Sequence, residues 1–249
     1  MGKKLEGKVA VVTGSSKGIG AEIAEELANN GATVVVNYAS SKAGADKVVE
    51  KIKSKGGKAI AIQANIANHE DIKKLFSEAS KKFGKVDILV NNAGVYEFAP
   101  IEKITAEHYD KMFDLNVKGL LLATQEALKY FGKSGSIVNI SSVASELALG
   151  EASVYSASKA AVDAITKSLS KELGPKNIRV NSINPGMIET EGIHTSGLIE
   201  GDFRDFVESK TPLGRIGKTT DIAPAVVFLV SDDASWITGE TLFITGGWR

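Results

Sequence analysis

The chain has 249 residues, of which 43% are hydrophobic and 24% charged, with 30 basic against 30 acidic side chains. This size and composition are typical of a globular chain with one large or two small domains, and the balanced charge favours no nucleic-acid or anionic-membrane partner. The absence of cysteine excludes disulfides, thiolate nucleophiles and cysteine-ligated metals. No apolar run approaches the ~20 residues that span a bilayer, and no secretory signal follows the N-terminal lysines. We therefore expect a cytoplasmic protein.

Short β-branched runs alternate with longer amphipathic stretches along the chain. Strands are predicted at 9–13, 33–36, 59–63, 86–90, 136–140, 179–183 and 241–245, and helices at 19–30, 41–55, 71–83, 107–130 and 154–173. This alternation predicts an α/β fold with a doubly wound (Rossmann-type), seven-stranded parallel sheet and helices on both faces. No linker or repeat divides the sequence, so residues 1–249 are expected to form a single domain. Residues 189–212 have no clear period and are interpreted as a substrate lid.

A glycine-rich turn connects the first predicted strand to the first predicted helix. It reads Thr13-Gly14-Ser15-Ser16-Lys17-Gly18-Ile19-Gly20. Glycines permit a tight turn, and the free N–H groups of a helix N-terminus bind a pyrophosphate well. The spacing G-x3-G-x-G differs from the commoner G-x-G-x-x-G, and a turn without a ligand is the alternative. Its place between strand and helix favours nucleotide binding.

Tyr155 and Lys159 lie four residues apart in a predicted helix, so their side chains share one face. A free tyrosine titrates near ~10. A cation about 4 Å away at an effective dielectric of roughly 20 contributes roughly 4 kcal/mol, or about three pKa units in favour of the phenolate. Such a shift would bring the phenol close to neutral pH, where a general acid or base works best. A surface helix with a solvated lysine is the alternative.

Several further motifs follow in a fixed order. They are Asn91-Asn92-Ala93-Gly94, Asn116, Ser142, Tyr155-x3-Lys159 and Pro185-Gly186. With these motifs the chain resembles, over nearly its whole length, the compact single-domain branch of the short-chain dehydrogenase/reductase family. It is similar to 3-oxoacyl-(acyl-carrier-protein) reductases, glucose dehydrogenases and ketoreductases. The resemblance implies an NAD(P)-dependent oxidoreductase. Its implied partners are a small carbonyl or alcohol substrate and further copies of the chain in a homotetramer.

The resemblance also implies four catalytic residues. Tyr155 would donate a proton in reduction and accept it in oxidation, while Lys159 would hold the nicotinamide ribose and lower the pKa of the tyrosine. Ser142 would hydrogen-bond the substrate carbonyl, and Asn116 would support a water that connects Lys159 to solvent. Two hydroxyl donors aimed at the carbonyl oxygen would stabilise the negative charge that develops there.

Two of these assignments leave alternatives open. Ser141 and Ser145 lie close to Ser142 in sequence, although the thirteen-residue offset to Tyr155 in the family pattern selects Ser142. Asn116 on a helix could instead hydrogen-bond the local backbone.

The second predicted strand has no acidic residue at its end, where a carboxylate would bind the ribose 2′-hydroxyl of NAD. The strand continues as Asn37-Tyr38-Ala39-Ser40-Ser41. Nothing there would repel a 2′-phosphate, and Lys17 occupies a position where relatives that prefer NADP often carry a basic residue. We therefore favour NADP(H), with NAD(H) as the alternative because no arginine follows the strand.

The remaining cofactor contacts are implied by the resemblance. Asn65 stands where the family usually has an aspartate, and its amide oxygen would accept from the adenine amino group. The Ile188 backbone and Thr190 would meet the nicotinamide carboxamide. The expected cofactor-binding residues are Gly14, Ser16, Lys17, Gly18, Ile19, Gly20, Tyr38, Ser40, Asn65, Ile66, Asn92, Ala93, Gly94, Tyr155, Lys159, Pro185, Gly186, Ile188 and Thr190. No metal site is predicted, because the three histidines do not share a metal-ligand spacing.

The segments after the fourth and fifth strands are candidates for the substrate pocket. They contribute Glu97, Phe98, Glu146, Leu147 and Leu149. The segment Ser145-Glu146-Leu147-Ala148-Leu149-Gly150 is fairly apolar, which indicates a hydrophobic carbonyl substrate. A 3-oxoacyl-(acyl-carrier-protein) reductase and a glucose 1-dehydrogenase are alternatives within the enzyme class. A non-catalytic nucleotide-binding protein is the alternative from another class, and the intact serine, tyrosine and lysine set argues against it.

Overall fold

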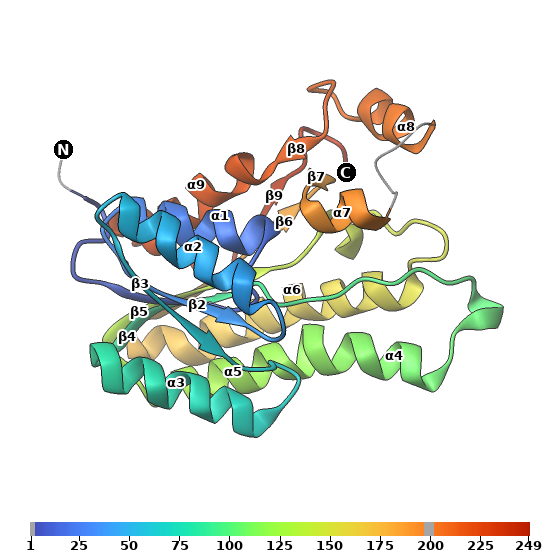
Figure 1. Cartoon of the computed structure of the whole chain (residues 1–249). Helices are drawn as coiled ribbons and strands as arrows, with labels where there is room; N and C mark the ends of the chain where they lie inside the picture. The colour runs from blue at the N-terminus through green and yellow to red at the C-terminus, as the bar shows by residue number, and fades with distance from the viewer. Residues whose placement is uncertain (1–2, 197–201) are drawn as a thin grey trace.

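The computed structural model describes residues 3–196 and 202–249, and its centre is a sheet of seven parallel strands (Figure 1). The sheet has the order β3-β2-β1-β4-β5-β6-β9. Its strands are β1 (Val9–Val12), β2 (Thr33–Tyr38), β3 (Lys58–Gln63), β4 (Val86–Asn91), β5 (Phe131–Ile140), β6 (Ile178–Pro185) and β9 (Thr241–Ile244). This arrangement confirms the predicted doubly wound sheet.

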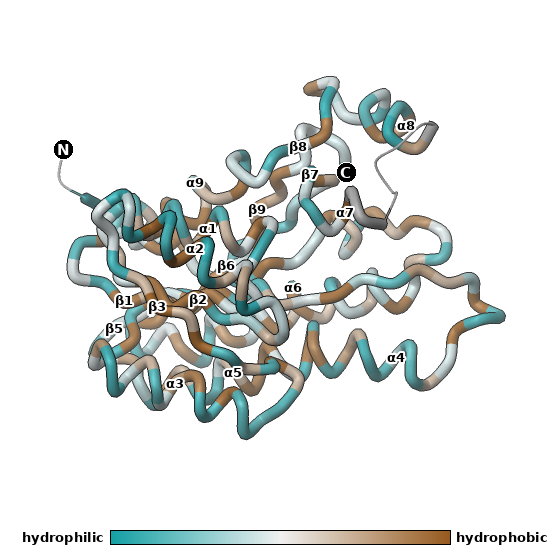
Figure 2. Tube along the Cα trace, in the orientation of Figure 1, coloured by the Kyte–Doolittle hydropathy of each residue, from teal (hydrophilic) through white to brown (hydrophobic). Residues whose placement is uncertain are grey.

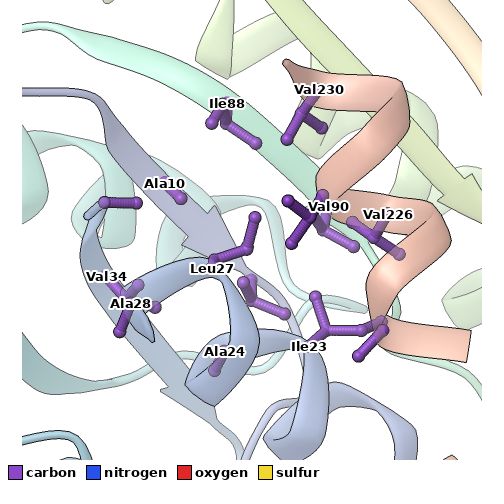
Figure 3. Close-up of a cluster of buried hydrophobic side chains, with 14 of the residues drawn as sticks. Ala10, Ile23, Ala24, Leu27, Ala28, Val34, Ile88, Val90, Val226 and Val230 are labelled. Atoms are coloured by element: carbon purple, nitrogen blue, oxygen red, sulfur yellow. The ribbon is translucent and has the colours of Figure 1, made fainter. Parts of the chain in front are cut away.

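Helices cover both faces of the sheet (Figure 1). One face carries α1 (Gly18–Asn29), α2 (Lys42–Ser54) and α9 (Thr219–Val230), and the other carries α3 (His69–Phe83), α4 (Ala106–Phe113), α5 (Leu120–Ala127) and α6 (Ser153–Leu173). The central strands are hydrophobic, whereas the outer surfaces of the helices are largely hydrophilic (Figure 2). Leu27 of α1 and Val226 of α9 pack over Val90 of β4 on one face (Figure 3). Phe76 of α3 packs with Leu89 of β4 in the cluster on the other face, so the sheet is buried on both sides.

The strand order reverses between β1 and β4, because the chain winds to β2 and β3 on one side and to β5, β6 and β9 on the other. Doubly wound sheets bind ligands in the crevice at the carboxyl ends of the strands at such a switch point. The glycine turn after β1 and the Asn-Asn-Ala-Gly segment after β4 meet there. The fold therefore places the two predicted nucleotide-binding motifs side by side.

Three segments differ from the sequence-based expectation. The helix predicted at 107–130 is α4 and α5 joined by a π-helical segment, η2 (Asp114–Gly119). Helix α9 was not predicted, because its sequence is apolar on every side and contains Pro224, a residue that usually ends a helix. Short 3-10 helices lie at η1 (Ile101–Lys103), η3 (Val143–Ser145), η4 (Gly174–Lys176) and η5 (Asp232–Ala234).

The third difference concerns the expected lid at 189–212. Its described part contains α7 (Glu191–Ser196) and α8 (Asp202–Lys210), while 197–201 lie outside the described residues. A small second sheet pairs β7 (Ile188–Glu189) with β8 (Gly217–Lys218) at the base of this segment. Over 3–196 and 202–249, no helix combines the length and the apolar character needed to cross a bilayer.

Candidate active site

A cavity of about 270 Å³ lies at the carboxyl ends of the central strands. Its walls come from the segments after β4, β5 and β6, from the start of α6, and from the lid and the C-terminus. The predicted site residues that line it are Ile19, Asn92, Gly94, Ser142, Tyr155, Lys159, Pro185, Gly186, Ile188 and Thr190. The fold thus brings together residues from five separate sequence motifs.

Lys159 is buried at the base of this cavity. Helix α6 presents Tyr155 and Lys159 on one face, as their spacing predicted. The Lys159 ammonium is held by a hydrogen bond from Nζ to the carbonyl oxygen of Ile140 over 3.0 Å, and Nζ lies 5.8 Å from the Tyr155 ring centroid. Burial lowers the pKa of Lys159 to about 8, and the negative charge of Asp163, one turn further along α6, opposes that shift.

The pKa of Tyr155 departs from the expectation. Burial raises it above the usual value for tyrosine, and the hydrogen bond with Ser142 opposes the rise. The expected lowering of this pKa by Lys159 is therefore wrong. Removing the phenolate from water outweighs the attraction of a cation 5.8 Å from the ring centroid.

Ser142 is the serine that faces Tyr155, and its two competitors have other partners. The Ser141 hydroxyl donates to the backbone carbonyl of Lys159 over 3.0 Å. The Ser145 hydroxyl accepts from Asn184 Nδ2 over 2.9 Å. The Ser142 backbone carbonyl accepts from the same amide over 3.1 Å, so Asn184 holds the turn that carries Ser142.

Asn116 lies in the π-helical segment and is 2% exposed. Its Oδ1 accepts from the backbone N–H of Val95 over 2.9 Å, and its Nδ2 donates to Val95 O over 2.9 Å and to Ser158 Oγ over 3.1 Å. A Cβ atom on Gly94 would lie 3.2 Å from Asn116 Oδ1 and 3.5 Å from Lys159 Nζ. Local backbone bonding, the alternative role, is thus present, and the Asn116 amide and the Lys159 ammonium both lie next to Gly94.

The glycine turn packs tightly against the segment after β4. Gly14 has a φ of +61°, and a Cβ atom on Gly20 would lie 2.3 Å from Asn92 Nδ2, so neither position accommodates a side chain without displacement. Asn92 Nδ2 donates to Thr13 O and Gly14 O over 2.9 Å each. Thr13 Oγ1 accepts from the backbone N–H groups of Asn92 and Ala93. Asn92 therefore ties the two nucleotide-binding motifs together.

The beginning of α1 fits a pyrophosphate. Its N-cap residue, Lys17, is exposed and makes no side-chain capping hydrogen bond. The N–H groups of the first helical turn have no intrahelical acceptors, and they suit an anion. A Cβ atom on Gly18 would lie 3.6 Å from the Thr190 side chain, so the turn and the base of the lid meet without an intervening side chain. Ser16 belongs to the same turn, and these residues fit a dinucleotide.

Of the residues predicted to bind the adenosine half of the cofactor, some are buried in the core and others are exposed. Tyr38 and Ile66 are 7% and 4% exposed and pack in the apolar core, so their side chains do not face the cavity. Asn65 is exposed, and its Oδ1 accepts from the backbone N–H of Ala67 over 3.0 Å. Ser40 is exposed at the end of β2.

The predicted pocket lining is partly confirmed. Phe98, Leu147 and Leu149 line the cavity, whereas Glu97 and Glu146 are not among its lining residues. Glu97 instead forms an ion pair with a lysine of α4.

Several further lining residues were not singled out from the sequence, among them Tyr96, Ile193, Phe203 and Trp248. Tyr96 follows β4 by five residues, and that position was a usable signal. Ile193 and Phe203 belong to the segment that was expected to act as a lid, whereas Trp248 comes from the C-terminal segment, which only the tertiary fold brings to the site.

Comparisons with known proteins agree with this geometry. The family model described as enoyl-(acyl carrier protein) reductase matches residues 14–249. An uncharacterized oxidoreductase of Methylorubrum extorquens is 55% identical over 99% of both chains. A probable tetrahydroxynaphthalene reductase of Zymoseptoria tritici is 39% identical over 98% of this chain and 95% of its own. The crystal structure of a short-chain dehydrogenase from Burkholderia cenocepacia in complex with NADP is 37% identical, covers 98% of each chain and superposes with a TM-score of 0.92.

The chain therefore belongs to the short-chain dehydrogenase/reductase family. It is an NAD(P)-dependent oxidoreductase, as the sequence motifs predicted.

Proposed function

We propose that the protein is an NADPH-dependent carbonyl reductase in which Ser142, Tyr155 and Lys159 handle the proton. The observation that carries this proposal is that Ser142, Tyr155 and the buried Lys159 line one cavity, with Lys159 held by the carbonyl oxygen of Ile140. Two hydroxyl groups that converge on one point form a binding site for a single carbonyl oxygen.

When bound, a nicotinamide cofactor would supply the hydride that adds to the carbonyl carbon. Tyr155 Oη transfers its proton to the substrate oxygen, so the products are a secondary alcohol and the oxidised cofactor. Ser142 donates a hydrogen bond to the same oxygen as charge develops on it. Lys159 binds the nicotinamide ribose and stabilises the tyrosinate that remains, and Asn116 supports the water through which a proton returns. In the reverse reaction Tyr155 accepts the proton.

The preference for NADPH over NADH rests on the chemistry after β2. Ser40, Ser41 and Lys42 are exposed there, and no carboxylate stands at the strand end where it would repel a 2′-phosphate. Asn37, the polar residue inside the strand end, accepts from the Gly14 N–H over 3.0 Å and carries no charge. The NADP-bound relative from Burkholderia cenocepacia supports the same choice. We expect Ser40→Asp to lower kcat/KM for NADPH at least tenfold relative to NADH.

We further propose that 189–212 close over the substrate as a lid on a single domain of 1–249, and that the protein is a homotetramer. Thr190 and Ile188 lie at the base of the lid and line the cavity, which supports a link between lid position and nicotinamide binding. Sedimentation velocity at micromolar concentration tests the tetramer, and protection of the lid from proteolysis by NADPH tests the closure.

Initial rates with NADPH and NADH over a panel of ketones, acetoacetyl thioesters and sugars test the function. We expect reduction of neutral ketones with NADPH at the highest kcat/KM. Exclusive activity with a carrier-protein thioester would favour the 3-oxoacyl-(acyl-carrier-protein) reductase, and oxidation of glucose would favour the dehydrogenase. Tight NADPH binding without turnover of any carbonyl would indicate a non-catalytic nucleotide-binding protein.

A further inference from the structure

The charges around the cavity restrict the substrate. Lys159 is the one charged residue among the described residues that line it. The neighbouring segment 194–202, whose side chains are not described, contains no lysine or arginine in its sequence. Among the described lining residues, a carboxylate or phosphate on the substrate would therefore have no cation to pair with apart from the lysine that serves the reaction. Burying an unpaired anion is costly, so the cavity favours a neutral substrate.

One wall of the cavity is aromatic and stands directly against the phenol of Tyr155. The Tyr96 and Phe98 ring centroids lie 6.3 and 6.1 Å from that of Tyr155, at interplanar angles of 69° and 84°. Tyr96 and Phe98 are themselves 6.0 Å apart. Their edge-on arrangement leaves ring surface available to a ligand, because both side chains are more than one third exposed. A substrate that presents its carbonyl to Tyr155 contacts this wall.

Other parts of the cavity lining are also apolar. Leu147 and Leu149 come from the segment after β5, and Phe203 and Trp248 come from α8 and the C-terminal segment. A Cβ atom on Gly192 of α7 would lie 4.0 Å from the Tyr96 hydroxyl, so the aromatic wall reaches the lid. Aromatic rings in offset or edge-to-face contact contribute ~0.5–1.5 kcal/mol each beyond their buried area.

We propose that the natural substrate is a neutral ketone fused to or carried by an aromatic ring system, whose ring lies against Tyr96 and Phe98. This inference rests on the proposed carbonyl reductase activity. Reduction moves a hydride from the reduced cofactor to the carbonyl carbon and the Tyr155 proton to its oxygen. A ring-fused secondary alcohol and the oxidised cofactor leave.

Matched pairs of ketones test the effects of an aromatic ring and of charge on kcat/KM while the reactivity of the carbonyl is kept similar. 2-Tetralone and trans-2-decalone are of similar size, and both have an unconjugated carbonyl, but only the first has an aromatic ring. Methyl 4-acetylbenzoate and 4-acetylbenzoate differ in charge. With the full-length protein and saturating NADPH, we expect kcat/KM at least tenfold higher for 2-tetralone than for trans-2-decalone. We also expect it at least tenfold higher for the ester than for the anion.

Substitutions test whether Tyr96 and Phe98 cause the preference for the aromatic ketone. Phe98→Ala and Tyr96→Leu should each lower kcat/KM for 2-tetralone about tenfold, and for trans-2-decalone less than threefold. Tyr109→Ala removes an aromatic side chain that stacks on Phe113 outside the cavity lining, and should change neither value. Unchanged NADPH affinity and melting temperature show that the variants fold.

Three results would overturn the proposed substrate class without contradicting the reductase activity. They are equal kcat/KM for 2-tetralone and trans-2-decalone, a higher kcat/KM for the anion than for the ester, and equal losses of kcat/KM for both ketones in Phe98→Ala and Tyr96→Leu. No turnover of any ketone with NADPH or NADH would overturn the proposed function itself.

Discussion

Asn184 Nδ2 donates to Asp163 Oδ2 over 2.9 Å and thereby joins the end of β6 to the catalytic helix α6. The same amide group donates to the backbone carbonyl of Ser142 over 3.1 Å. Asp163 lies one turn beyond Lys159, and its charge raises the pKa of that lysine against the effect of burial. The Asn184–Asp163 pair therefore acts on two catalytic residues. Asn184 holds the backbone of Ser142, and Asp163 influences the charge of Lys159.

Removal of the Asp163 charge should make Lys159 lose its proton at lower pH. In Asp163→Asn the charge that opposes the desolvation of Lys159 is gone, so its pKa falls below the wild-type value of about 8. We expect the pH above which NADPH affinity weakens to decrease, as measured by fluorescence titration between pH 6 and 10. Glu172→Gln, the same charge change at an exposed position on α6, is the control. Coincident pH profiles for wild type and Asp163→Asn would contradict the electrostatic role.

Loss of the Asn184 amide should affect turnover more than cofactor binding. In Asn184→Ala the Asp163 carboxylate and the Ser142 carbonyl lose a donor, which costs about 1–3 kcal/mol of stability. Because the serine turn is then less firmly held, we expect kcat to fall about tenfold with the NADPH Kd within threefold of wild type.

Asn181→Ala is the matched control for that variant. Asn181 is a fully buried asparagine on the same strand, and it hydrogen-bonds Ile237 and Glu240 away from the cavity. It should lose similar stability in chemical denaturation but keep its kcat. Similar kcat values in Asn184→Ala and Asn181→Ala would show that the Asn184 amide is structural only.

Gly20 should not tolerate a methyl group. The Cβ atom of Gly20→Ala would lie 2.3 Å from Asn92 Nδ2 and 2.7 Å from the carbonyl oxygen of Gly14, and the latter is backbone that cannot move aside cheaply. We expect a loss of about 1–3 kcal/mol in stability and weaker NADPH binding. Gly174→Ala, where a Cβ atom meets nothing within 4 Å, should leave both unchanged. Wild-type stability and NADPH affinity in Gly20→Ala would show that the turn is looser than described.

The buried Lys159 should make stability depend on pH. Its folded pKa of about 8 lies below the 10.5 of an ordinary lysine, so between these values the unfolded chain binds more protons than the folded protein. Stability contributed by this group is therefore lowest below about pH 8 and rises toward pH 10.5. Relative to Lys159→Met, the wild-type free energy of unfolding should increase by about 1–2 kcal/mol between pH 8 and pH 9.5 in urea titrations. A constant difference between the two proteins would contradict the low pKa.

Local patterns in the sequence were sufficient for the sheet, because apolar β-branched runs such as that of β1 form strands in most contexts. The same patterns could not reveal α9, which is apolar on every side and contains Pro224. Helical spacing put Tyr155 and Lys159 on one face, but the pKa of Tyr155 depends on burial by segments distant in sequence. The Asn184–Asp163 contact was missed for a similar reason, since it joins residues on different elements.

In the proposed mechanism, the Tyr155 hydroxyl supplies the proton in carbonyl reduction. Tyr155→Phe keeps the ring that packs against Tyr96 and Phe98 and removes only the donor, so the cavity should keep its shape. General acid catalysis contributes roughly 10²–10⁴-fold to a rate.

The most direct measurement is therefore single-turnover reduction of 2-tetralone by Tyr155→Phe preloaded with NADPH, followed by the loss of NADPH absorbance, with the NADPH Kd measured on the same sample. We predict a rate constant lower by at least about a hundredfold and a Kd within threefold of wild type. A rate constant within threefold of wild type would contradict the account.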